Sequence, residues 1–349
     1  MTVPDRPLRR VEPEPERLAA RLTAAAQAWS PGVEVTSVRR LAHGASSLTY
    51  TASTSHAAVP LIVVKVAPAG LTATHHRDVL RQARVLELLS GDDGVPVPEA
   101  LFTDPGDDEV GRLFAMPFRE GGAYEPAIEE PPDPAPSVAD LRGRALHAAS
   151  ILARLHAPRA LGVDEEPAVS LVDEIERWDR ALATLPDHFG LDWRARSQRL
   201  RSTMPAPWPL RLTHGDYRIG NMLCVGPRVT AVVDWEIWAV SDPRLDLGWF
   251  LLNLDPDHPA AVRPVEGLPT PAEILAAYGG EPFDHRWFVA AALYKFAATT
   301  GLIGKNALKR GEADSWGARM IPRLPAVLDR IDALLENEGH GISGHPVRG

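Results

Sequence analysis

The chain has 349 residues, with 37 lysines and arginines against 46 aspartates and glutamates, which gives a formal net charge of −9. This acidic balance argues against a nucleic-acid-binding protein, which would present a basic face. The single cysteine, Cys224, excludes an internal disulfide framework and a cysteine-based zinc site, and it agrees with a cytoplasmic location. No secretory signal or apolar run of roughly 20 residues is seen, so we expect no membrane contact.

The first part of the chain predicts a small β-rich lobe. Short β-prone runs are separated by turns, and the run Leu61–Val66 predicts a buried strand that is interrupted by Lys65. The apolar positions before and after these runs recur with a helical period. The expected elements are a helix from Glu16 to Trp29, strands between Val33 and Val66, a helix from His75 to Leu89 and a strand from Arg112 to Phe118.

The later part of the chain predicts a mainly helical lobe. Residues 121–136 are acidic and rich in proline, so we expect a connection between lobes, with the acidic run from Glu125 to Asp133 in solvent. Ser137 followed by Asp140 predicts a helix start with a capping box. Further helices are expected over residues 171–185, 192–201, 244–254, 271–278, 285–300 and 325–337, with one β region over residues 210–235.

These patterns predict an α+β fold with two lobes. We expect residues 1–120 to form a small β-rich lobe, residues 121–338 to form a larger, mainly helical lobe, and residues 339–349 to form a disordered tail.

Three polar residues in the β region stand at informative spacing. His214-Gly215-Asp216 is followed by Asn221 five residues after the aspartate, and Asp234 stands at the end of the next strand. Gly226-Pro227 predicts a hairpin turn between the two strands, so Asp216, Asn221 and Asp234 are expected to converge.

This set of residues suits phosphoryl transfer, in which catalysis is mostly positioning and electrostatic stabilisation. Asn221 and Asp234 offer the oxygen ligands that a hard dication such as Mg²⁺ prefers. Asp216 could orient an acceptor hydroxyl and take its proton. Glu236 could bind a second metal ion or be solvated, and we favour the metal. A metal-dependent hydrolase using Asp216, Asp234 and Glu236 is a less favoured alternative, because it leaves Lys65 unexplained.

The same segment resembles the aminoglycoside phosphotransferase and choline kinase branch of the protein-kinase-like fold. The spacing from His214-Gly215-Asp216 to Asn221 is similar to the kinase catalytic loop with glycine in place of arginine, and Asp234-Trp235-Glu236 resembles the metal-binding motif of this branch. Residues 241–248, SDPRLDLG, and residues 151–156, ILARLH, also resemble family segments. These sequence motifs are most similar to those of the phosphotransferases that resemble the ones fused to acyl-CoA dehydrogenases.

The resemblance implies a bilobal protein-kinase-like fold and a kinase that uses ATP and Mg²⁺ to phosphorylate a hydroxyl group of a small molecule. It implies that residues 1–120 form the nucleotide-binding lobe and that residues 121–338 form the catalytic and acceptor-binding lobe. It extends more loosely into the amino-terminal half. There it implies nucleotide contacts from a glycine-containing loop, a phosphate-binding lysine and a hinge strand, which correspond to Gly44, Ser46, Ser47, Lys65, Met116 and Phe118.

One position departs from the family pattern. The family usually pairs its phosphate-binding lysine with a glutamate, and the run that starts at Arg81 places Gln82 at that site. A glutamine carbonyl can accept a hydrogen bond from Lys65, but it carries no charge. Glu87 is an alternative partner. A nucleotide-binding protein with weak or no transferase activity is therefore a second hypothesis, and the acceptor and the oligomeric state stay open.

Nearby residues are expected to be structural. We expect His214 to brace its loop, Asp246 to cap or brace the following helix, and Trp249 to pack on an apolar helix face. Cys224 is expected to be a packed core thiol.

Overall fold

The computed structural model describes residues 12–41, 48–68, 78–91, 94–107, 109–158, 166–280 and 284–336. The predicted disordered tail lies outside these residues. Contacts within the chain define two compact units. Unit 1 consists of Met1–Gly122, Met222–Val225 and Val229–Trp238, and unit 2 consists of Ala123–Asn221, Gly226–Arg228 and Ala239–Gly349.

An antiparallel five-stranded sheet forms the centre of unit 1, as the β-prone runs predict. The strand order is β1-β2-β3-β5-β4. The strands are β1 (Val35–Arg40), β2 (Leu48–Thr54), β3 (Leu61–Val66), β4 (Phe102–Asp104) and β5 (Leu113–Pro117).

One face of this sheet carries the core of unit 1. Helix α1 (Pro15–Trp29) packs its buried leucines against the sheet, in one cluster with Ile62, Val64 and Val66 of β3. Burying each such side chain contributes about 1.5–3 kcal/mol. The alternate residues of β3 are only half-buried, so this strand is not buried on both faces as its sequence predicts. Because side chains alternate along a strand, Lys65 lies on the face opposite this core.

Unit 1 is completed by α2 (Val79–Leu89) and by a hairpin of β8 (Met222–Val225) and β9 (Arg228–Val232). Gly226 has φ 53°, a left-handed conformation that favours glycine, and so the predicted hairpin turn is confirmed. The hairpin joins the rest of unit 1 through an isolated bridge between Gly122 and Cys224, and the thiol of Cys224 is buried, as expected. The amide of Val232 also donates to the carbonyl of Pro96 at 2.8 Å.

Unit 2 is mainly helical, as predicted. The capping box of Ser137 and Asp140 is present at the start of its first helix. Its helices are α3 (Val138–Leu155), α4 (Leu171–Leu182), α5 (Trp193–Ser202), α6 (Arg244–Asn253), α7 (Pro271–Tyr278), α8 (His285–Lys309), α9 (Trp316–Met320) and α10 (Leu324–Glu336). A three-stranded sheet has the order β6 (Ala168–Val169), β10 (Ala239–Ser241) and β7 (Arg211–Thr213).

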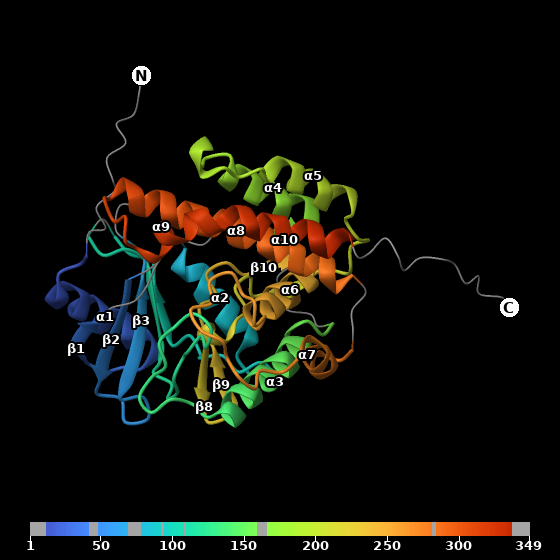
Figure 1. The fold of residues 1–349 in the computed structure, drawn as a ribbon. Helices are drawn as coiled ribbons and strands as arrows, with labels where there is room; N and C mark the ends of the chain where they lie inside the picture. Colours follow the sequence, from blue (N-terminus) through green and yellow to red (C-terminus); the bar gives the residue numbers. More distant parts are fainter. Residues whose placement is uncertain are drawn as a thin grey trace, which may run out of the picture. The chain divides into compact units, whose positions relative to one another are not determined.

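Helix α8 is the central helix of unit 2. It packs against α4, α6, α9 and α10 (Figure 1). By length and composition it is the one helix in the described ranges that could cross a membrane, but 72% of its most apolar window is buried inside the structure. Its apolar residues are therefore explained by the core that it forms with neighbouring helices.

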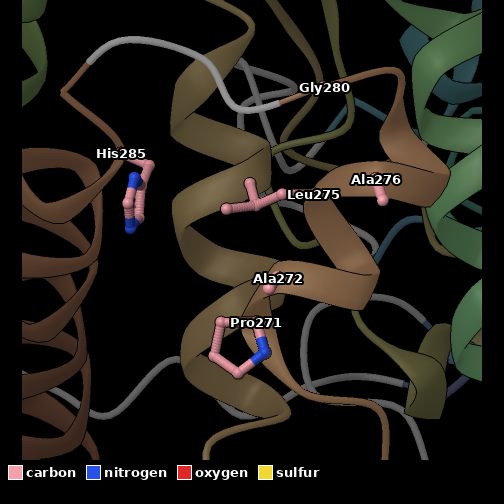
Figure 2. Close-up of a pocket in the computed structure, with 6 residues that line it drawn as sticks. All are labelled: Pro271, Ala272, Leu275, Ala276, Gly280 and His285. Carbon is pink, nitrogen blue, oxygen red and sulfur yellow. The ribbon is translucent and has the colours of Figure 1, made fainter.

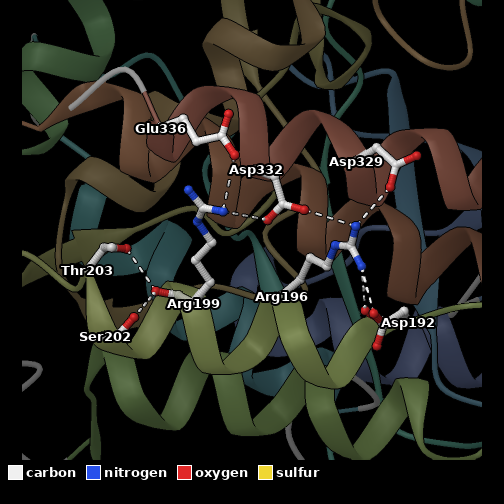
Figure 3. A network of polar contacts seen from close by, with 8 residues as sticks. All are labelled: Asp192, Arg196, Arg199, Ser202, Thr203, Asp329, Asp332 and Glu336. Atoms are coloured by element: carbon white, nitrogen blue, oxygen red, sulfur yellow. Dashed lines mark hydrogen bonds and ion pairs between the residues drawn. The ribbon is translucent and has the colours of Figure 1, made fainter. Parts of the chain in front are cut away.

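Charged side chains join α5 to α10 on unit 2 (Figure 3). Arg196 pairs with Asp192 at 2.9 Å, with Asp329 at 2.8 Å and with Asp332 at 2.9 Å. Arg199 also reaches Asp332, at 3.4 Å. Because Arg196 is only 15% exposed and shared among three carboxylates, this network contributes more than an isolated surface pair would.

Candidate active site

The predicted site residues divide between the two units. Unit 1 holds Lys65, Gln82, Met116, Phe118, Asp234 and Glu236. Unit 2 holds Asp216 and Asn221. The predicted phosphate-loop residues Gly44, Ser46 and Ser47 lie outside the described residues.

Lys65 and Asp234 form an ion pair within unit 1. The ammonium of Lys65 lies 3.1 Å from Oδ1 of Asp234, and the two side chains are 14% and 36% exposed. Asp234 follows β9 and has φ 68°, a left-handed conformation that is uncommon for a residue with a side chain and that aspartate adopts more readily than most. Trp235 is buried beside it and donates from Nε1 to the carbonyl of Val232 at 3.0 Å, which holds this turn in place.

Asp234 is thus the charge partner of Lys65, rather than Gln82 or Glu87. Gln82 is buried, and its Nε2 has no hydrogen-bond partner among the described residues, whereas Glu87 is exposed. Arg81 holds α2, the helix that carries Gln82, in place. The guanidinium of Arg81 donates to the carbonyl of Trp238 at 2.8 Å, and the indole of Trp238 donates to the carbonyl of Arg81 at 3.0 Å.

The predicted hinge residues differ in what they offer a ligand. Met116 is buried in β5 opposite Val63. Phe118 is 46% exposed, but its amide donates to the carbonyl of Leu61 at 3.0 Å. Phe118 therefore offers its ring, and not its N–H, for contact with a base. Glu236 is half-buried in the segment after Asp234.

In unit 2, two donors fix the carboxylate of Asp216. Trp249 donates from its indole Nε1 to Oδ1 at 2.7 Å, and Asn221 donates from Nδ2 to Oδ2 at 2.8 Å. The preceding Gly215 has φ 82°, so the turn requires a residue that adopts this conformation. The Asp216 side chain stays 28% exposed, which leaves the fixed carboxylate accessible to a ligand.

The surroundings of Asp216 keep it ionised. Burial by itself would raise the pKa of Asp216, but Arg218, Lys295 and the hydrogen bond from Asn221 outweigh burial, and the pKa lies below its usual value. Arg218 forms an ion pair with Asp216, in which Nε lies 3.4 Å from Oδ2. An ionised, oriented carboxylate can accept a hydrogen bond from a hydroxyl and receive its proton as the hydroxyl attacks.

Asn221 has a side chain suited to a metal ligand. It is 5% exposed, and Nδ2 donates both to the backbone carbonyl and to the carboxylate of Asp216 at 2.8 Å. This use of the amide nitrogen leaves the carbonyl oxygen of Asn221 as an acceptor. An amide oxygen suits Mg²⁺, which keeps several waters and is bound through few protein ligands together with phosphates. No group of three His, Cys, Asp or Glu side chains that could bind a metal occurs in the described ranges.

Glu125 is a residue that sequence reasoning placed wrongly. It is fully buried instead of solvated, and its Oε2 accepts from the amide of Gly220 at 2.9 Å and from Arg218 at 3.3 Å. Its Oε1 is buried without a partner among the described residues. Burial raises the pKa of Glu125 to about 7, although the charge of Arg218 lowers it. Glu125 therefore ties the loop before α3 to the segment between Asp216 and Asn221.

Asp246 also braces the turn that carries Asp216, and not only its own helix. Its carboxylate accepts from the amides of His214 at 2.6 Å and Gly215 at 2.8 Å, and it lies 3.4 Å from Nε2 of His156. His214 is buried, and its Nδ1 accepts from the amide of Asp216 at 3.2 Å, as its expected bracing role requires. Helix α6 is thereby joined to the turn that carries Asp216.

A pocket of about 390 Å³ lies elsewhere in unit 2, beside α7 and the start of α8 (Figure 2). It contains none of the predicted site residues, and short apolar side chains dominate its lining. The lining residues are Pro271, Ala272, Leu275, Ala276, Gly280 and His285.

The chain is similar to known proteins both in sequence and in fold. Residues 37–288 match the model of the phosphotransferase enzyme family, APH. The chain is 25% identical over 305 residues to acyl-CoA dehydrogenase family member 10 from Mus musculus, covering 81% of this chain but only 27% of that protein. The chain thus spans about a quarter of the length of this curated relative.

Solved structures show the same fold. A Ralstonia eutropha protein, named as a candidate aminoglycoside phosphotransferase, superposes with a TM-score of 0.69 at 20% identity, over 92% of this chain and 99% of that chain. The GDP and kanamycin complex of the aminoglycoside phosphotransferase APH(2″)-IIIa has a TM-score of 0.61 at 17% identity, over 90% and 98%. A choline/ethanolamine kinase family protein from Mesorhizobium loti has a TM-score of 0.57 at 18% identity, over 92% and 99%. The fold is kinase-like, and the chain belongs to the APH phosphotransferase enzyme family.

Proposed function

We propose that this protein is an ATP- and Mg²⁺-dependent kinase that transfers the γ-phosphate to a hydroxyl group of a small molecule. The observation that carries the proposal is the state of Asp216, which is ionised, oriented by two donors and still 28% exposed. A carboxylate in this state suits deprotonation of an acceptor hydroxyl. The cytoplasmic location expected from the sequence stays a prediction.

The roles of the other residues follow from their chemistry. Lys65 would bind phosphate oxygens, and Asp234 would exchange its contact with Lys65 for a metal ion. Asn221 would offer its carbonyl oxygen to a metal and would hold Asp216 through its amide nitrogen. Mg²⁺, when bound, supplies positive charge to the phosphates. The prediction that Glu236 binds a second metal is part of the same proposal.

The acceptor is left to experiment. Relatives of this fold have been solved with GDP and kanamycin and with ADP and spectinomycin. Our candidate acceptors are aminoglycosides, choline-like or homoserine-like metabolites, sugars and hydroxyacyl thioesters. Both ATP and GTP should be offered as donors, because one of these relatives was solved with GDP and the other with ADP.

The test combines an acceptor screen with two variants. We expect Asp216→Asn to lower the turnover number by roughly 10²–10⁴, the range for a positioned base, while nucleotide binding persists. Lys65→Met should instead weaken nucleotide binding, measured by calorimetry with ATP and Mg²⁺. Asp314→Asn is the matched control, because Asp314 is an exposed aspartate of unit 2 and its replacement should leave both quantities unchanged.

Two outcomes would contradict the proposal. Turnover in Asp216→Asn equal to that of the wild-type protein would remove Asp216 from the reaction. Tight nucleotide binding without transfer to any acceptor would favour the second hypothesis, a nucleotide-binding protein without transferase activity.

A further inference from the structure

Helix α8 presents a lysine to the turn that carries Asp216. The ammonium of Lys295 donates to the carbonyl of Gly215, the residue just before Asp216. The same ammonium lies 4.1 Å from the ring centroid of Trp249 and 5.9 Å from that of Trp178. Lys295 therefore contacts the backbone of the catalytic turn and the faces of two indoles.

One of these indoles is itself a support of the catalytic carboxylate. Trp249 donates its indole N–H to Oδ1 of Asp216 at 2.7 Å. A cation over the face of an aromatic ring is attracted to the ring and withdraws electron density from it, which makes the indole N–H a stronger hydrogen-bond donor. Lys295 thus acts on Asp216 along two routes, through the Gly215 carbonyl and through Trp249.

Burial of the Lys295 ammonium is unfavourable, so a purely structural role would not require a lysine at this position. Burial lowers the pKa of Lys295, and the charge of Asp216 counteracts this effect. A methionine of similar length would fill the same space without that cost. The charged groups that act on Lys295 come from several elements and are Asp216, Glu174, Arg177 and Asp246.

We propose that Lys295 is a positioning residue for phosphoryl transfer, which orients Asp216 through the carbonyl of Gly215 and the indole of Trp249. This inference rests on the proposed kinase function. Lys295 touches neither nucleotide nor acceptor in this role, and its contribution is to hold the catalytic carboxylate in one orientation.

The first test separates turnover from binding. We expect Lys295→Met to lower kcat by about 10–100-fold with little change in the KM of either substrate, because a misplacement of about 1 Å costs up to about 10²-fold. Trp249→Phe should have a similar effect, and the double variant should lose little more than either single variant, because the two residues act on one group. Strictly additive losses would exclude the Trp249 route.

The second test restores the missing cation. In Lys295→Ala, added propylamine should recover part of kcat, because its ammonium can donate to the Gly215 carbonyl and lie over the indoles. Tetramethylammonium has the charge but no N–H, so it should recover less. Lys305→Met is the matched control on the same helix, because the Lys305 ammonium contacts Thr184 instead of the catalytic turn.

The third test does not depend on finding an acceptor. Hydrogen exchange of the amides in residues 213–217, followed by mass spectrometry, should be faster in Lys295→Met than in the wild-type protein and unchanged in Lys305→Met. Unchanged exchange, or a Lys295→Met variant with wild-type kcat, would overturn the inference. A wild-type protein that phosphorylates no acceptor would instead count against the proposed function, and the exchange measurement would still decide whether Lys295 orders the turn that carries Asp216.

Discussion

Glu125 makes the stability of the protein depend on pH in an unusual direction. This fully buried carboxyl group accepts from Gly220 and Arg218 through Oε2, while its Oε1 has no partner among the described residues. Burial raises its pKa from 4.5 to about 7. Between these two values the folded protein holds a proton that the unfolded chain has released, so the free energy of unfolding falls as the pH rises through this window.

The replacement Glu125→Gln removes this titration and keeps a carbonyl oxygen for the amide of Gly220. One pKa unit corresponds to about 1.36 kcal/mol, so the complete shift amounts to roughly 3 kcal/mol. Most of this difference develops between pH 5 and pH 8. We therefore expect the stability of the wild-type protein relative to Glu125→Gln to fall by about 2.5 kcal/mol over that range.

Equilibrium urea denaturation of both proteins at pH 5, 6, 7 and 8 measures this difference. Any difference between glutamine and the protonated carboxyl group in their hydrogen bonds adds an offset that is the same at every pH, and other titrating groups largely cancel between the two proteins. The slope is therefore the diagnostic quantity. A stability difference that does not change with pH, or one that changes in the opposite direction, would refute the description of Glu125 as a buried group with a raised pKa.

Two further predictions concern the surface of unit 2. Glu273 closes the capping box with Thr270 and pairs with Arg142, and the hydrogen bond from the Thr270 amide is the main cause that lowers its pKa to about 2. Glu273→Gln should therefore destabilise the protein above about pH 4.5, and acid titration of unfolding should show the difference from wild type vanish as the pH falls through about 2. Arg196→Met should lower the free energy of unfolding by about 1–2 kcal/mol, and by less in 1 M salt. Arg180→Met breaks an exposed ion pair at 3.8 Å and should change the free energy of unfolding by under about 0.5 kcal/mol. Equal effects of the two replacements would contradict the argument that the network is stronger than an isolated pair.

Local signals in the sequence predict much of the fold. The capping box of Ser137 and Asp140 and the turn at Gly226 are both confirmed, because each depends on residues close together in the chain. Strand β10 (Ala239–Ser241) lies outside the β region predicted over residues 210–235. It has only three residues, and its hydrogen bonds go to β7 and β6, so no local pattern marks it.

The site shows the same division between local and distant causes. Spacing alone brings Asp216 and Asn221 into contact, as predicted, since only five residues separate them. The burial of Glu125 could not be read from its acidic neighbours, because the groups that bind it lie 93 and 95 residues further along the chain. The contact of Lys65 with Asp234 similarly replaces the expected one with Gln82.

Two missed residues carried signals that could have identified them. Trp249 was assigned to the core, yet a buried indole N–H needs a hydrogen-bond acceptor. Lys295 stands between Tyr294 and Phe296 in an apolar helix. A lysine in an apolar helix, like Lys65 in an apolar strand, indicates a special role, because lysine is almost never fully buried unless it is paired. The tertiary packing decides which hydrogen-bond acceptor the Trp249 indole contacts and which group the Lys295 ammonium contacts.

The ion pair of Lys65 and Asp234 also bears on how the protein is made. The two residues are 169 positions apart, and the hairpin that leads to Asp234 belongs to unit 1 although Ala123–Asn221 of unit 2 precede it in the chain. At the usual speed of translation, Lys65 leaves the ribosome on the order of ten seconds before its partner. A fragment that ends at residue 122 would lack both the hairpin and Asp234, so the ribosome must deliver much of the second unit before the first can be completed.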